Sequence, residues 1–133
     1  MTVLASLLAP IFLLFHIVGP LPADLGVKDG ELNACRTSAH CARQIWESTH
    51  PEEDFNRLTS LVKESPRTVV VEQSELYLHA EASSAFFGFV DDLELFADLS
   101  QNQIQARSES RLGDSDLGVN AARLAELRSA LQH

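Results

Sequence analysis

The feature that most constrains this chain is a change of hydrophobic period near residue 67. After it come four short runs that are β-branched, aromatic or alternately apolar and polar: residues 68–71, 76–83, 87–96 and 103–111. A period of two places every second side chain on one face, as in a β-strand with one buried face. Brief polar turns separate the runs, so we expect a four-stranded antiparallel meander.

The stretch before this change has the period of an α-helix. Pro51 and the three acids that follow it suit a first turn, and Ser48 or Thr49 is the expected N-cap. One helical face then collects Phe55, Leu58, Thr59 and Val62. Ser65-Pro66 ends the pattern, because the residue before a proline disfavours the helical region.

A second helix is expected from Asn120 to Leu131, with Asn120 as its N-cap. Its apolar face carries Leu124, Leu127 and Leu131. Helix, strands and helix in this order predict an α+β fold. We therefore expect a four-stranded antiparallel meander with flanking helices, preceded by an apolar N-terminal segment.

That apolar segment covers residues 3–18, where His16 is the one side chain able to carry a charge. Its length favours a signal peptide; a retained membrane anchor and a buried core helix are the alternatives. We expect residues 1–25 to be the signal peptide or anchor and residues 26–133 to form a single domain. The expected location is extracytoplasmic (periplasm, lumen or secreted), with membrane association through residues 3–18 if the segment is retained.

Cys35 and Cys41 are the two cysteines of the chain. An even count behind an export signal favours a disulfide. Free thiols are one alternative, and a metal site completed by His40 and His50 is another, although the spacing matches no standard zinc knuckle. Trp46, just downstream, is expected to be a core residue.

The formal net charge is −9, and no Lys or Arg occurs between Arg67 and Arg107. Nucleic-acid binding is excluded, because it needs a basic surface that displaces counterions from phosphate. The acidity fits a solvated surface, cation binding or repulsion from an anionic membrane.

Two blocks, residues 81–94 and 107–123, are too polar for an ordinary core. Together with the cysteine pair they carry a set of spaced residues: Cys35, Cys41, Glu81, Ser84, Phe89, Val90, Asp91, Asp92, Glu94, Arg107, Ser108, Ser110, Arg111, Gly113, Asp116, Gly118, Asn120 and Arg123. This set resembles the domain of unknown function 1499 family (DUF1499), over about residues 29–131. Arg36 and His40 depart from the family pattern. The resemblance implies an exported or membrane-associated protein, with no established reaction and no cofactor.

The strand period also makes a prediction about charge pairing. Arg107 and Arg111 lie four apart and share one face, and Asp91 shares a face with Leu93. If that face is the core, Asp91 needs a partner with several donors, and we expect Arg107 and Arg111 to supply it. In the turn that follows, Asp116 and Asn120 are expected to bond backbone groups.

Three interpretations of this polar set remain open. The first is a structural Arg–Asp network, and the second is a pocket for a small polar or anionic ligand. The candidate ligand-binding residues are Glu81, Asp91, Arg107, Ser110, Arg111, Asp116 and Asn120. The third is a divalent cation on Asp91, Asp92, Glu94 and Asp116, although neighbours on a strand point to opposite faces.

For function, we expect a non-enzymatic accessory domain that binds a protein partner or a small polar ligand. The alternative is a small metal-assisted or hydrolase-like enzyme that uses Asp91 and Asp92 with Arg107 and Arg111. No phosphate-binding loop, dinucleotide fingerprint or G-x-S-x-G motif occurs in the sequence.

Overall fold

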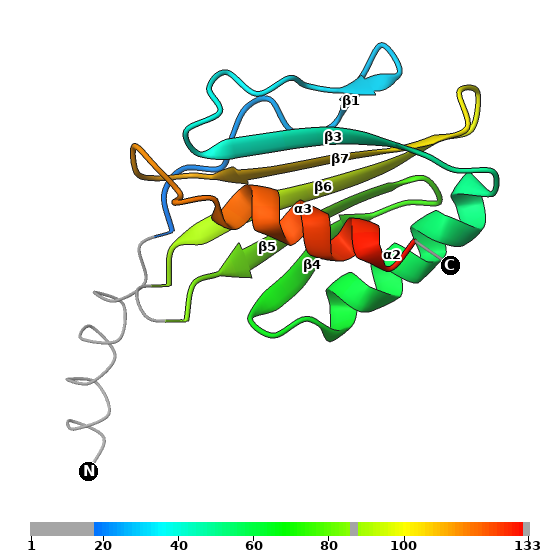
Figure 1. The fold of residues 1–133 in the computed structure, drawn as a ribbon. Helices are drawn as coiled ribbons and strands as arrows, with labels where there is room; N and C mark the ends of the chain where they lie inside the picture. Colours follow the sequence, from blue (N-terminus) through cyan, green and yellow to red (C-terminus); the bar gives the residue numbers. More distant parts are fainter. Residues whose placement is uncertain (1–17, 86–87, 132–133) are drawn as a thin grey trace.

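The computed structural model describes residues 18–85 and 88–131 and confirms the α+β class (Figure 1). The elements are β1 (Val27–Lys28), β2 (Glu31–Leu32), β3 (Cys41–Glu47), α2 (Pro51–Glu64), β4 (Thr68–Gln73), β5 (Tyr77–Ser83), β6 (Val90–Asp98), β7 (Gln103–Ser110) and α3 (Val119–Ser129). Within the described ranges no helix is long and apolar enough to cross a membrane. Of the predicted signal or anchor segment, residues 1–25, residues 1–17 lie outside the described residues, and with them all of the apolar stretch 3–18 except Val18.

The main sheet has five strands in the order β3-β7-β6-β5-β4, and every neighbouring pair is antiparallel. Strands β4 to β7 form the predicted meander. The predicted count of four was wrong because β3 adds a fifth strand beside β7. The alternation that would have revealed β3 is weak, since apolar side chains occur on both of its faces, as Ile45 and Trp46 show. A separate hairpin joins β1 to β2.

Helix α2 begins at Pro51 with three acids in its first turn, as predicted. The predicted cap was wrong: His50 is the N-cap residue and no side chain caps the helix. Ser48 instead donates its hydroxyl hydrogen to Asp54 Oδ2 over 2.6 Å, which fixes the entry into the helix. The predicted apolar face is buried, and the helix ends before Ser65.

Both helices lie on one face of the sheet (Figure 1). The core fills the space between them and the inward residues of the strands: Trp46, Leu78, Ala80, Leu93, Leu95, Ala97, Ile104 and Ala106. Leu124 and Leu127 of α3 close this core as predicted, and Leu131 packs against it. We call this side of the sheet the helix face.

Residues 18–34 lie against the opposite side of the sheet, and we call them the N-terminal cover. The backbone N–H of Gly26 donates to Glu94 Oε2 over 2.7 Å, and that of Leu32 donates to Gln105 Oε1 over 2.8 Å. Leu32 is buried by this contact. The sheet therefore has a second buried side, the cover face, and that side is lined mainly by polar residues.

The predicted disulfide is confirmed: Cys35 and Cys41 are bonded, with 5.7 Å between their Cα atoms. Cys35 follows the cover directly, and Cys41 begins β3. The bond therefore ties the end of the cover to the edge of the main sheet.

Candidate functional site

The residues predicted to form one site are divided between the two faces of the sheet. Asp91 faces the helices with Leu93, whereas Asp92 faces the cover, because neighbours on a strand point to opposite sides. Arg107 and Arg111 lie on the cover face with Asp92. The expected pairing of Asp91 with these two arginines was therefore wrong.

Arg107 is the centre of the network on the cover face and is 1% exposed. Its Nη1 donates to Glu94 Oε1 over 3.0 Å, and its Nη2 donates to Asp24 Oδ2 over 2.7 Å and to Glu109 Oε2 over 3.3 Å. Burial alone would lower the pKa of Arg107, but the three carboxylates outweigh burial and raise it. The ion pairs of Arg107 thus connect β6, β7 and the cover.

Glu94, itself 1% exposed, is held by more than Arg107. Tyr77 donates its hydroxyl hydrogen to Glu94 Oε2 over 2.7 Å, and the Gly26 backbone binds the same oxygen. Burial and the adjacent carboxylate raise the pKa of Tyr77 above its ordinary range. A buried carboxylate with donors on both oxygens fulfils the requirement for a stable buried charge.

Arg111 makes a second set of bonds on the cover face. It holds Asp92 through two bonds, Nε to Oδ2 over 2.8 Å and Nη2 to Oδ1 over 2.9 Å, and Nη2 also donates to Glu81 Oε2 over 2.9 Å. His79 Nε2 lies 2.7 Å from Asp92 Oδ1. Burial would raise the pKa of Asp92, but its hydrogen bonds to Arg111 and His79 prevail and lower it.

Asp91 has a different partner on the helix face. Arg123 of α3 places Nη2 2.9 Å from Asp91 Oδ2. Sequence reasoning gave Arg123 no role in the site. The signal was its spacing: Arg123 follows Asn120 by three residues, so both lie on the helix side that faces β6 and β7.

Asn120 is buried completely at the corner between β7 and α3. Its Nδ2 donates to Ser110 Oγ over 2.9 Å, to Asp116 Oδ2 over 2.7 Å and to the His40 carbonyl over 3.2 Å. Its Oδ1 accepts from Ser108 Oγ over 2.7 Å and from Arg123 Nη1 over 2.9 Å. One side chain therefore links the disulfide loop, β7 and α3.

The prediction that Asn120 is the N-cap of the last helix was wrong. Gly118 is the N-cap residue, in a left-handed conformation with φ 83°. Asp116 satisfies the backbone donors, accepting from Gly118 N over 2.8 Å and from Asn120 N over 3.2 Å. Burial would raise the pKa of Asp116, but these donors and the Asn120 side chain lower it.

The family model described as a protein of unknown function (DUF1499) matches residues 25–131. The chain belongs to the DUF1499 family. Searches of curated proteins and of solved structures found no match.

The residues that carry the DUF1499 pattern fall into two groups, one on each face of the sheet. Those bonded on the cover face are Glu81, Asp92, Glu94, Arg107 and Arg111. Those bonded around the corner on the helix face are Asp91, Ser108, Ser110, Asp116, Asn120 and Arg123. The signature therefore combines two hydrogen-bond networks on opposite sides of one sheet.

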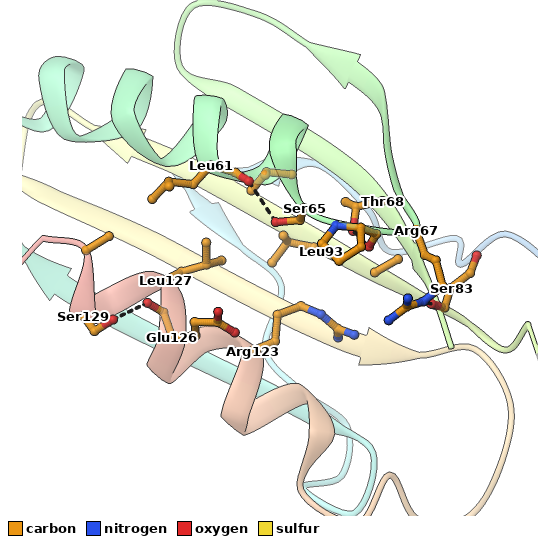
Figure 2. A pocket seen from close by; sticks show the side chains of 14 residues that line it. Leu61, Ser65, Arg67, Thr68, Ser83, Leu93, Arg123, Glu126, Leu127 and Ser129 are labelled. Carbon is orange, nitrogen blue, oxygen red and sulfur yellow. Dashed lines mark hydrogen bonds between the residues drawn. The ribbon is translucent and has the colours of Figure 1, made fainter. Parts of the chain in front are cut away.

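A groove of about 510 Å³ lies beside the second network, between the C-terminal end of α2 and α3. Its floor includes Ala82 and Leu93 from the sheet, and its walls include Leu61, Val62 and Leu127 from the helices. Figure 2 shows the guanidinium groups of Arg67 and Arg123 directed toward one another at one end of this groove. Sequence reasoning missed the groove, because only the tertiary fold places α2 and α3 on either side of it.

The two arginines of the groove differ from those of the cover face. Arg67 is exposed, donates its Nε hydrogen to the Ser83 carbonyl over 3.3 Å, and makes no ion pair within residues 18–85 and 88–131. Arg123 is partly exposed, pairs with Asp91 through Nη2 and donates through Nη1 to Ser108 Oγ and Asn120 Oδ1, each over 2.9 Å. Two arginines therefore meet beside two acids, Asp91 and Glu126, and within the described residues only Arg67 of this pair has no carboxylate partner and keeps its terminal guanidinium donors for an anion.

Proposed function

We propose that this DUF1499 protein is a non-enzymatic accessory domain that binds a small anionic ligand at the arginine end of the groove. The observation that carries the proposal is the convergence of Arg67 and Arg123 from opposite walls (Figure 2). Like charges directed toward one another repel, and an anion between them removes that repulsion. The guanidinium group of Arg67, bonded only through Nε within the described residues, also offers its two terminal nitrogens as donors to a carboxylate or phosphate.

In this proposal Arg107 and Arg111 stabilise the fold and do not bind the ligand. They are 1% and 4% exposed, and each is held by two or more carboxylates. A ligand would have to displace those carboxylates and leave them buried without a partner, which is costly. Arg67 needs no such exchange, because it is already exposed to solvent.

Glu126 also lines the groove, and its charge opposes an anion. Figure 2 places Glu126 on the side of Arg123 toward Ser129, away from Arg67. The anionic group of the ligand is therefore assigned to the space between Arg67 and Arg123, near Ser83.

The enzymatic alternative has less support. It requires Asp91 and Asp92 to act together with Arg107 and Arg111, but the two aspartates lie on opposite faces of β6. For the compartment we propose an extracytoplasmic location, because structural disulfides persist in oxidising environments.

The test is an NMR titration of the isotope-labelled full chain with sodium acetate. We expect saturable shifts of the backbone amides near Arg67, Ser83 and Arg123, and a loss of most of this binding in Arg67→Gln. Lys63→Gln is the matched control, since it removes the same charge from the exposed side of α2. Shifts that do not saturate, or equal weakening by both variants, would contradict the proposal.

A further inference from the structure

The groove is larger than a small anion needs. Its volume of about 510 Å³ falls within the range of pockets that hold drug-sized molecules, roughly 300–1,000 Å³. Beyond the arginine end, Glu126 lines one edge, and the rest of the lining is mainly apolar: Leu61, Val62, Leu93, Leu127 and Ala130. The groove therefore has a charged end and an apolar length.

Three of the hydroxyl groups that line the groove already donate to the protein backbone. Ser65 donates to the Leu61 carbonyl over 2.8 Å, and Ser129 donates to the Glu126 carbonyl over 2.6 Å (Figure 2). Thr68 donates to the Pro66 carbonyl over 3.0 Å. These donors are unavailable to a sugar or nucleotide, whose many polar atoms would lose water without gaining partners.

From this division we infer that the ligand is a single-chain alkyl carboxylate, such as a medium-chain fatty acid. Its carboxylate lies between Arg67 and Arg123, and its chain runs between α2 and α3 over Leu93. The inference rests on the proposed function and adds the chemical class of the ligand. An alkyl ammonium is disfavoured by the arginine pair, and an uncharged alcohol leaves that pair without a counter-charge.

The chain length of the ligand gives a quantitative expectation. Burial of one methylene contributes about 0.8 kcal/mol, which corresponds to about fourfold in affinity for each methylene that the groove covers. Affinity is therefore expected to rise steeply from acetate through hexanoate to decanoate and to level off when the chain reaches solvent. Decanol is expected to bind more weakly than decanoate.

The experiment is an NMR titration of the full chain with acetate, hexanoate, decanoate and decanol, each below its aggregation concentration. Site-resolved shifts separate binding in the groove from binding elsewhere. Leu61→Gln changes an exposed apolar residue of the groove, and Ile45→Gln changes a comparably exposed residue on β3. We expect Leu61→Gln to weaken decanoate by about fivefold or more without changing acetate, and Ile45→Gln to change neither.

Each outcome addresses one of the two proposals. Binding that depends on Arg67 but is equal for acetate and decanoate overturns the alkyl-carboxylate inference and leaves the anion site standing. Decanol binding as tightly as decanoate also overturns the inference. If no carboxylate produces saturable groove shifts that Arg67→Gln removes, both proposals fail.

Discussion

The two faces of the sheet are both buried, but different interactions hold them. On the helix face, side chains such as Leu95 and Ile104 pack against α2 and α3 and are 0% exposed. On the cover face, Arg107 and Glu94 are 1% exposed and bonded to each other. An apolar face tolerates inexact partners, whereas a buried charge requires a specific opposite charge. The cover face therefore specifies its contacts residue by residue, as the bonded corner around Asn120 does at one end of the helix face.

The largest expected effect comes from Arg107→Met. The change leaves Glu94, Asp24 and Glu109 without their shared cation. We expect a loss of about 3–5 kcal/mol in the free energy of unfolding, measured by urea titration at pH 7. The loss is comparable with the cost expected for Leu95→Ala on the helix face, about 2–5 kcal/mol.

Arg43→Met is the matched control, because Arg43 is the cross-strand neighbour of Arg107 on the same face. Arg43 bonds the neutral acceptors Leu32 O and Gln105 Oε1. We expect a clearly smaller loss. Equal losses for both variants would mean that the carboxylates give Arg107 no special role.

Asp92→Asn tests whether the Asp92 carboxylate makes the stability of the domain depend on pH. The pKa of Asp92 is lowered in the fold, so its contribution to stability is complete above its ordinary value of 3.8 and is lost as pH falls through the lowered value. We expect the variant to lose about 1.5–3 kcal/mol at pH 7, as for a hydrogen bond to a charged group. In urea titrations from pH 7 to pH 2, its stability should fall less steeply below pH 4 than that of the wild type. Parallel curves for the two proteins would contradict this account.

Removing the disulfide tests how firmly the cover is attached. The bond between Cys35 and Cys41 closes a short loop, so the double change to serine is expected to cost about 2 kcal/mol. Hydrogen exchange at the amides of Gly26 and Leu32 should accelerate more than exchange in the helix-face core. Uniform acceleration across both faces would show that the cover opens only with the whole domain.

The smallest effect on stability is expected for Arg67→Gln. The side chain of Arg67 is exposed and, within the described residues, bonds only the Ser83 carbonyl, so the free energy of unfolding should change by no more than about 0.5 kcal/mol. The same variant should lose acetate binding. A variant that is strongly destabilised would show that Arg67 supports the fold rather than a ligand.

The sequence predicted local structure well where one period dominates. The apolar face of α2, the meander from β4 to β7 and the shared face of Arg107 and Arg111 follow from spacing alone. Strand register does not follow from spacing. The register that pairs Glu94 with Arg107 points the Arg107 side chain toward the cover. A shift of one residue in that register would have turned the side chain toward the helix face, where Asp91 lies.

Tertiary contacts explain the remaining errors at the site. Asn120 has the chemistry of an N-cap, but the corner buries it among Ser108, Ser110 and the His40 carbonyl. The groove depends on α2 and α3 lying on either side of Leu93 of β6, and no local pattern in the sequence predicts that arrangement.

The central claim is that the buried charges of the cover face stabilise the fold by neutralising one another. A double-mutant cycle between Arg107 and Glu94 tests it most directly. Urea unfolding at pH 7 would be measured for Arg107→Met, Glu94→Gln and the double variant. We expect the double variant to be more stable than Arg107→Met alone, with a coupling energy of at least about 1 kcal/mol. Losses that add to within about 0.5 kcal/mol would contradict the claim.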